Sequence, residues 1–77
     1  MISDEQRARR ADLVVRFPLG ATVRASYDGL RVLGHLARGD GTIVGHSRDG
    51  GGVWVHWNSQ SQRTRHCYAP RFLELPG

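Results

Sequence analysis

The sequence predicts an all-β fold in which five short strands follow a short N-terminal helix. From residue 20 onward, apolar and polar side chains alternate with a period of two in short runs. Turn residues separate these runs, among them three consecutive glycines at 50–52, and the stretch YAPRFLEL closes the pattern. Only the first sixteen residues differ, because they are rich in charge. The 77 residues suffice for one domain.

The N-terminal helix is predicted from Asp4 to Val14. Ser3 and Gln6 form a capping-box pattern, and acidic residues fill the first turn. The dipeptide Phe17–Pro18 ends the helix, because the residue before a proline is displaced from the helical region. The apolar stripe is thin and consists of Ala8, Ala11, Leu13, Val14 and Val15. We therefore expect the helix to pack loosely or to stay partly frayed.

The first strand follows Gly20, where Ala21, Val23 and Ala25 alternate with polar residues. Residues 27–40 are interrupted by glycine and aspartate around LRVL and HLA. They predict a long hairpin-like loop, with local strand at Leu30–Leu33.

The second strand is predicted over Gly41–Ser47 and the third over Val53–Trp57. The RDGGG segment between them is the turn, where glycine adopts positive φ without steric cost. In the third strand, the valines and Trp57 point to one face, and Trp54 and His56 point to the other.

The fourth strand is predicted over residues 63–68. One of its faces carries Thr64, His66 and Tyr68, and the other carries Arg65 and Cys67. A single helical turn follows at Ala69–Phe72, and a short closing strand at Leu73–Leu75. Five strands, a long first loop and a helical turn before the last strand describe a five-stranded SH3-like barrel, in which closure removes exposed strand edges. The predicted division is a helix or tail over 1–17 and a barrel over 18–77.

All eleven basic residues are arginines, and the net charge is +4. Arginine suits phosphates, carboxylates and aromatic rings, although codon usage in a GC-rich genome would produce the same bias.

Cys67 is the only cysteine and cannot form an intramolecular disulfide. The sequence contains no pattern of a signal peptide or a membrane span, so we expect a cytoplasmic protein without membrane contact. The small core favours a homo-oligomer, either a dimer or a tetramer.

Aromatic and basic residues supply the candidate recognition surface. Trp54, Trp57 and Tyr68 are large and amphipathic, and neighbouring arginines suit stacking or cation–π contact. The alternative is that Trp57 is core and Trp54 belongs to a subunit contact. Four arginines favour nucleic-acid binding, although no dense basic run is present: Arg48, Arg63, Arg65 and Arg71.

Enzymatic and metal-site motifs are weak. The four histidines recur at the spacing of strands in a small barrel, and no Cys or His pair has the short spacing of a structural zinc site, so we predict no metal. His56 and His66 fit either a cross-strand pair or exposed positions. The glycines at 50–52 precede a strand, so they do not form a phosphate-binding loop.

Gly20–Leu75 resembles the SH3-like barrel of the type B, trimethoprim-insensitive dihydrofolate reductases in GATVRAS, GTIVG and TRHCYAPRFLEL. It is also similar to small phage-encoded and proteobacterial barrels of unassigned role. In the reductase family four barrels surround a pore that binds NADPH and dihydrofolate. The resemblance places the family's ligand-binding run on Arg65, His66, Cys67 and Tyr68, its preceding serine on Thr64 and its pore lysine near Ala25. Only the tyrosine is retained.

The leading hypothesis is a small SH3-like binding module of phage or mobile-element type, without a cofactor. It would self-associate and engage a protein or nucleic-acid partner through an aromatic, arginine and histidine face. The predicted binding residues are Trp54, His56, Arg63, Thr64, Arg65, His66, Cys67 and Tyr68. The alternative is a homotetrameric NADPH-dependent dihydrofolate reductase, with His66 and Tyr68 as the residues that act on the ligands.

Overall fold

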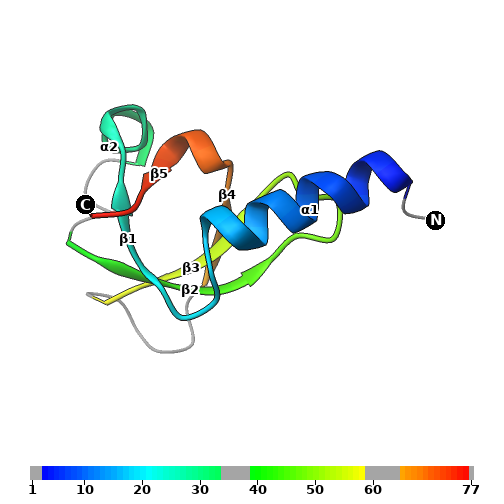
Figure 1. Ribbon diagram of the computed structural model, residues 1–77. Helices are drawn as coiled ribbons and strands as arrows, with labels where there is room; N and C mark the ends of the chain where they lie inside the picture. Colours follow the sequence, from blue (N-terminus) through cyan, green and yellow to red (C-terminus); the bar gives the residue numbers. More distant parts are fainter. Residues whose placement is uncertain (1–2, 34–38, 59–64, 77) are drawn as a thin grey trace.

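A computed structural model describes residues 3–33, 39–58 and 65–76, which form a five-stranded antiparallel sheet with two α-helices (Figure 1). The order of strands in the sheet is β4-β3-β2-β1-β5. The elements are α1 (Asp4–Arg16), β1 (Thr22–Ala25), α2 (Tyr27–Leu33), β2 (Gly41–His46), β3 (Val53–Trp57), β4 (His66–Tyr68), the 3₁₀ helix η2 (Pro70–Phe72) and β5 (Leu73–Glu74). The five predicted strands are confirmed, whereas the all-β class is confirmed only as a sheet-rich fold, because a second α-helix is present. The predicted closure into a barrel is not seen in the described residues, because β4 and β5 stand at the two ends of the strand order.

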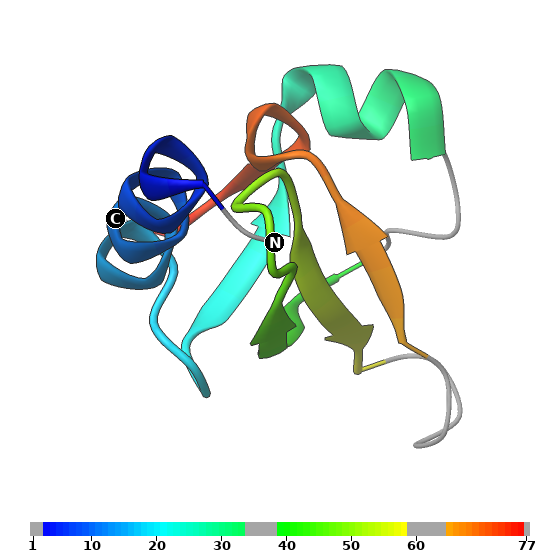
Figure 2. The same ribbon diagram turned by 90° about the vertical axis from the view of Figure 1, so that its right-hand side faces the viewer.

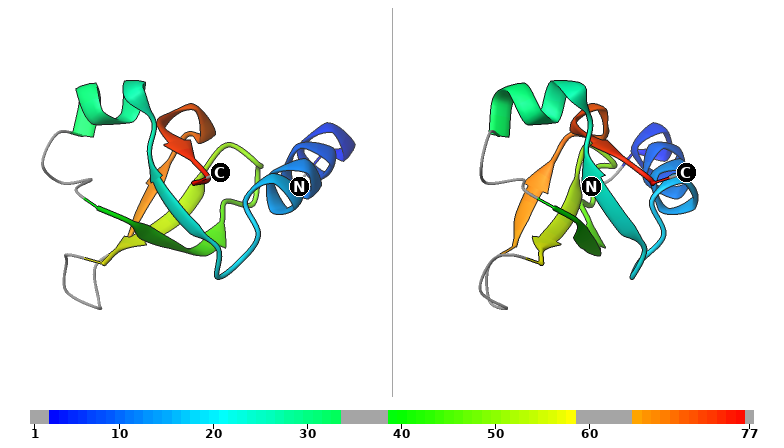
Figure 3. Two further views of the ribbon diagram at one scale, coloured as in Figure 1. Left: turned by 60° about the vertical axis from the view of Figure 1, so that its left-hand side comes forward. Right: turned by 90° about the vertical axis from the view of Figure 1, so that its left-hand side faces the viewer.

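The helix α1 begins as predicted. The Gln6 backbone N–H donates to the Ser3 hydroxyl over 3.2 Å, and the Ser3 backbone N–H donates to the Gln6 side chain over 3.0 Å. The helix extends two residues beyond the predicted end at Val14 and stops at Phe17. Of its apolar stripe, only Leu13 is buried. The long axis of α1 therefore extends past the edge of the sheet, and its first turn, in dark blue, lies farthest from the sheet (Figure 3, left).

The prediction of a loop with local strand at Leu30–Leu33 is wrong, because residues 27–33 form α2. Ser26 starts this helix: its hydroxyl accepts the Gly29 backbone N–H over 3.2 Å, and its carbonyl accepts the Leu30 backbone N–H over 2.9 Å. A serine that reads in the sequence as the last polar residue of a strand is thus the start of a helix.

Within the described residues, nine buried apolar side chains form the core. They come from α1, from the residue after it and from the sheet: Leu13, Phe17, Val23, Ala25, Ile43, Val53, Val55, Trp57 and Leu73. The predicted faces of β3 are confirmed, because Val53, Val55 and Trp57 are fully buried and the two residues between them are half-buried. Trp57 is therefore a core residue, which agrees with the alternative interpretation of the aromatic residues and not with a role for Trp57 in recognition.

The remaining elements follow the prediction with shorter bounds. The described part of the fourth strand is β4, while Arg63 and Thr64 lie outside the described residues. The helical turn before the last strand is confirmed as η2, followed by the two-residue strand β5. The ring of His46 forms a 2.6 Å hydrogen bond with the Phe17 carbonyl, so this histidine connects β2 to the end of α1.

Asp49 orders the glycine-rich turn between β2 and β3. Its Oδ1 accepts hydrogen bonds from the Ser47 hydroxyl over 2.8 Å and from the Gly51 backbone N–H over 2.9 Å. These bonds, the backbone one first, hold the pKa of Asp49 below its ordinary value of 3.8.

The pH dependence of stability should report this turn. A carboxyl whose pKa is lower in the folded state stabilises that state above its ordinary pKa, and the contribution disappears as the pH falls through the folded value. We expect the wild type to be more stable than Asp49→Asn near neutral pH, with a difference that shrinks below pH 3.8. Urea unfolding of both proteins across the acid range measures this difference. A difference that does not change with pH would contradict the role of the charge.

Candidate functional site

The outward face of β3 and β4 brings together several of the predicted binding residues. Trp54 and His56 are half-buried on β3, and Cys67 of β4 pairs directly with Trp54 in the sheet. The Arg65 guanidinium carbon lies 5.5 Å from the centre of the Trp54 ring, within cation–π range. We call Trp54, His56, Arg65 and Cys67 the outer face. The planar cation of Arg65 lies over the aromatic ring of Trp54.

His66 and Tyr68 lie on the other side of β4. The Tyr68 hydroxyl accepts a 2.8 Å hydrogen bond from Nε1 of the core residue Trp57, and their ring centres are 5.7 Å apart. The exposed His66 ring lies 6.2 Å from the Tyr68 ring. The six predicted residues that the structure describes therefore do not form a single face: strand alternation separates Trp54 and Arg65 from His66 and Tyr68.

The four predicted basic residues do not form a single described patch. Arg65 directly precedes β4 and Arg71 follows this strand on η2, so the two arginines lie at opposite ends of β4. Figure 2 shows η2 beyond the far end of the orange strand β4. Arg48 is exposed in the turn between β2 and β3. Arg71 has a different aromatic partner, because its guanidinium carbon lies 4.8 Å from the centre of the Phe72 ring.

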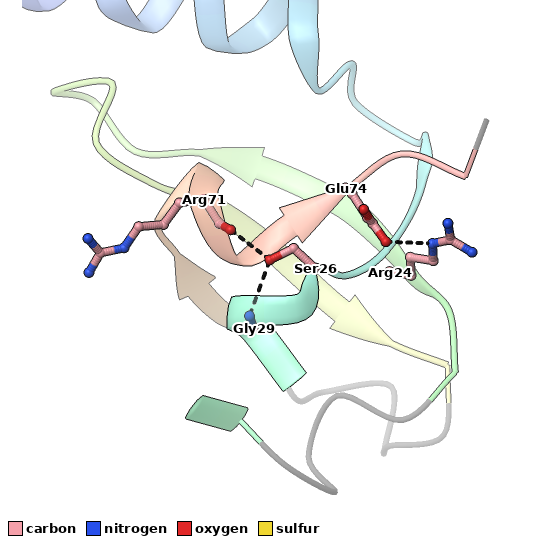
Figure 4. A network of polar contacts seen from close by, with 5 residues as sticks. All are labelled: Arg24, Ser26, Gly29, Arg71 and Glu74. Atoms are coloured by element: carbon pink, nitrogen blue, oxygen red, sulfur yellow. Dashed lines mark hydrogen bonds and ion pairs between the residues drawn. The ribbon is translucent and has the colours of Figure 1, made fainter. Parts of the chain in front are cut away.

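A second group of residues, not predicted as a site, lies where α2 meets η2 (Figure 4). The Ser26 hydroxyl donates to the Arg71 carbonyl over 2.7 Å while it accepts from the Gly29 backbone N–H. A pocket of about 400 Å³ opens beside this network. It is lined by Asp28, Arg31, Val32, Arg71 and Phe72. The sequence signal was Ser26 followed by Asp28, because a serine before an acidic first turn is typical of a helix start.

Cys67 is not set up as a nucleophile. Burial raises the pKa of its thiol above the ordinary value of 9.0, and the negative charge of Asp49 adds to this effect. The thiol is therefore protonated at neutral pH, whereas nucleophilic chemistry needs the thiolate. Within residues 3–33, 39–58 and 65–76, no three His, Cys, Asp or Glu side chains are grouped so that they could hold a metal ion.

The described part of the chain contains no helix whose length and apolar character would let it cross a membrane. Comparison with protein-family models, with curated proteins and with solved structures finds no match for this chain. A functional assignment therefore depends on the chemistry of the outer face and of the pocket beside α2.

Proposed function

We propose that this chain is a self-associating binding module of the SH3-like barrel type, and that its outer face binds single-stranded nucleic acid. The observation that carries the proposal is the contact between Arg65 and Trp54 on an outward sheet face. A base of any identity stacks on an aromatic ring or on a guanidinium plane, and a guanidinium also binds the phosphate backbone. Both elements of single-strand recognition are thus adjacent.

The order of the elements supports the SH3-like assignment. A long connection that contains α2 follows β1, a short turn joins β2 to β3, and a 3₁₀ helix immediately precedes β5. The strand β1 pairs with both β2 and β5, so the last strand returns beside the first. The same architecture serves unrelated functions, and the site has to supply the functional argument.

The charge distribution around the outer face favours an anionic partner. The strands β2, β3 and β4 contain no aspartate or glutamate. Two exposed arginines, Arg48 and Arg65, flank these strands, and the net charge of the chain is +4. Asp49 follows Arg48 and its charge acts on Cys67, so Arg65 is the cation that the outer face contributes. A nucleic acid carries both the negative charge and the flat rings that match the arginine and the tryptophan of this face. An acidic or neutral protein surface of the same shape does not combine the two in this way.

Self-association is supported by the small core and by the edge strand β4. The core contains nine side chains, and a domain of this size has little stability to spare. In the described sheet, β4 pairs with β3 alone, so its other edge is available to a second copy. Sedimentation velocity of the full chain measures the stoichiometry, and a monomer at all concentrations would contradict this part of the proposal.

The binding test is fluorescence anisotropy of a labelled oligothymidylate titrated with the full chain at several salt concentrations. We expect affinity to fall with salt, because bound arginines release counterions. Trp54→Ala should weaken binding by roughly 5- to 100-fold, the cost of one lost base–aromatic stack. Arg65→Gln should reduce the slope of log affinity against log salt concentration by the equivalent of about one phosphate contact. The control is Arg7→Gln on α1, which removes the same charge away from the outer face and should have a small effect.

Two outcomes would reject the nucleic-acid assignment. One is the absence of binding at low salt, and the other is binding that Trp54→Ala and Arg65→Gln leave unchanged. If these variants instead alter only the association of the chain with itself, the outer face is a protein contact. Thermal unfolding of each variant confirms that the change acts on binding and not on folding.

The second candidate function is the NADPH-dependent dihydrofolate reductase that the resemblance implies. It is supported by the exposed His66 beside Tyr68. The centres of their rings lie 6.2 Å apart on β4, the strand at the edge of the described sheet. This function requires a homotetramer, so the sedimentation experiment tests its premise. Titration with NADPH, followed by a dihydrofolate turnover assay, tests its chemistry. Turnover that His66→Ala and Tyr68→Phe leave unchanged would contradict the site.

A further inference from the structure

We propose a second binding site in the pocket between α2 and η2. Its ligand is a small molecule with an oxyanion group, either a carboxylate or a phosphate, attached to an apolar or aromatic group. The pocket is lined by Asp28, Arg31, Val32, Arg71 and Phe72 and has a volume of about 400 Å³. This volume is within the usual range for small-ligand pockets and is sufficient for a substituted ring with its acidic group. The outer face contributes none of these residues.

The backbone that carries the pocket is held by a network centred on Ser26. Its backbone N–H donates to the Phe72 carbonyl over 2.9 Å, and its hydroxyl donates to the Arg71 carbonyl over 2.7 Å. The same hydroxyl accepts the Gly29 N–H of α2. A side chain at Gly29 would collide with the Phe72 carbonyl, so α2 and η2 are in direct contact there. Both walls of the pocket are thus fixed relative to each other before any ligand arrives.

Arg31 and Arg71, which belong to different elements, both line this pocket, and among the described residues neither forms an ion pair with a carboxylate. In the described part of the chain, the ion pairs are Arg24 with Glu74 at 2.9 Å and Arg16 with Asp12 at 3.8 Å. Neither Arg31 nor Arg71 takes part in one. Figure 4 shows the Arg71 side chain directed away from the Ser26 network, which uses only its carbonyl. Its guanidinium therefore remains available for an anion.

The apolar side of the pocket specifies the rest of the ligand. Phe72 is half-buried beneath the Arg71 guanidinium, 4.8 Å from it, and Val32 of α2 is 66% exposed. A ligand that places an oxyanion between the arginines can lay a ring or an aliphatic chain against these two side chains. Asp28 adds a negative charge to the same pocket, so it opposes anion binding and sets the selectivity against highly charged ligands.

The test uses the full chain and three probes: phenyl phosphate, benzoate and inorganic phosphate. Heteronuclear NMR follows the Arg31 and Arg71 side-chain Nε–H groups and the Phe72 backbone amide during each titration. We expect saturable shifts at these groups with phenyl phosphate or benzoate. Inorganic phosphate should bind more weakly, because it lacks the apolar body. The stronger of the two aromatic probes identifies phosphate or carboxylate as the natural acid.

Variants separate a built site from general attraction of anions to a basic protein. Arg31→Gln and Arg71→Gln should each weaken phenyl phosphate binding by roughly tenfold, the cost of a charge-assisted hydrogen bond. Asp28→Asn should strengthen it by a few-fold, because a repulsive charge is removed. Arg7→Gln, which removes the same positive charge from an exposed position on α1, should leave the affinity within about twofold.

Both arginine variants should keep the fold, since the Ser26 network contacts the Arg71 backbone and not its guanidinium. Their amide spectra outside the pocket serve as the check. Equal losses for Arg7→Gln and the two pocket variants, or shifts spread over all exposed arginines, would overturn the proposal. So would benzoate and phenyl phosphate binding no better than inorganic phosphate. None of these results bears on nucleic-acid binding by Trp54 and Arg65.

Discussion

Replacing Trp57 with alanine should lower the free energy of unfolding by about 3–5 kcal/mol, the usual cost of removing a buried tryptophan side chain. Trp57 is fully buried and is the largest of the fully buried side chains. A domain of 77 residues has about 4–12 kcal/mol of stability in total. This loss is a large share of the total, so the variant should unfold at a much lower urea concentration than the wild type, which urea titration followed by circular dichroism measures.

Trp57→Phe is the matched control for this prediction. It keeps an aromatic side chain in the core and removes the indole N–H that donates to the Tyr68 hydroxyl over 2.8 Å. A double-mutant cycle with Tyr68→Phe isolates this hydrogen bond, which we expect to contribute about 1 kcal/mol. If Trp57→Ala costs no more than Trp57→Phe, the ring does not fill the core as the structure indicates. The cycle also shows how firmly Tyr68 is held on the inner side of β4.

Replacing Gly50 with alanine should destabilise the protein and displace α1 from the sheet. Gly50 has a φ of +76°, a conformation that costs an L-residue about 1–2 kcal/mol. An added Cβ would also lie 2.6 Å from the Arg10 backbone nitrogen and 2.8 Å from the Arg9 carbonyl carbon. Backbone atoms within a helix cannot yield as a flexible side chain would, so α1 has to move as a unit.

Urea unfolding and amide hydrogen exchange in α1 measure the two parts of this effect. We expect a loss of more than about 1–2 kcal/mol, together with faster exchange near Leu13, the residue that anchors α1 in the core. Gly51→Ala is the control, because its added Cβ would meet the Asp49 carboxylate at 3.2 Å and no backbone of α1. An equal loss in both variants would show that the turn itself, and not the contact with α1, is responsible.

Local signals in the sequence were sufficient for most of the secondary structure. The capping box of Ser3 and Gln6 placed the start of α1, because both partners lie within one helical turn. Alternation within β3 placed Trp57 and Trp54 on opposite faces, because successive side chains in a strand point to opposite sides, and the structure shows that the Trp57 face is the buried one.

The helix α2 is the element that local signals missed. Seven residues that include a glycine form a weak helix in isolation, since helix nucleation is costly. Tertiary contacts stabilise it: Ser26 hydrogen-bonds to the carbonyls of Arg71 and Phe72, which lie near the other end of the chain. Such a contact does not appear in a local pattern, so the segment read as a loop.

The sequence by itself therefore determined the number of strands, their buried and exposed faces, the cap of α1 and an excess of arginine over acidic residues. Only the tertiary structure decided which of these residues act together. The pairing of β4 with β3 places Cys67 opposite Trp54 and brings Arg65 over its ring, while His66 and Tyr68 fall on the other side. Packing of α2 against η2 brings Arg31 and Arg71 to one pocket. The physical reason is that alternation and capping are local, whereas strand register and contacts between distant elements depend on how the whole chain packs its core.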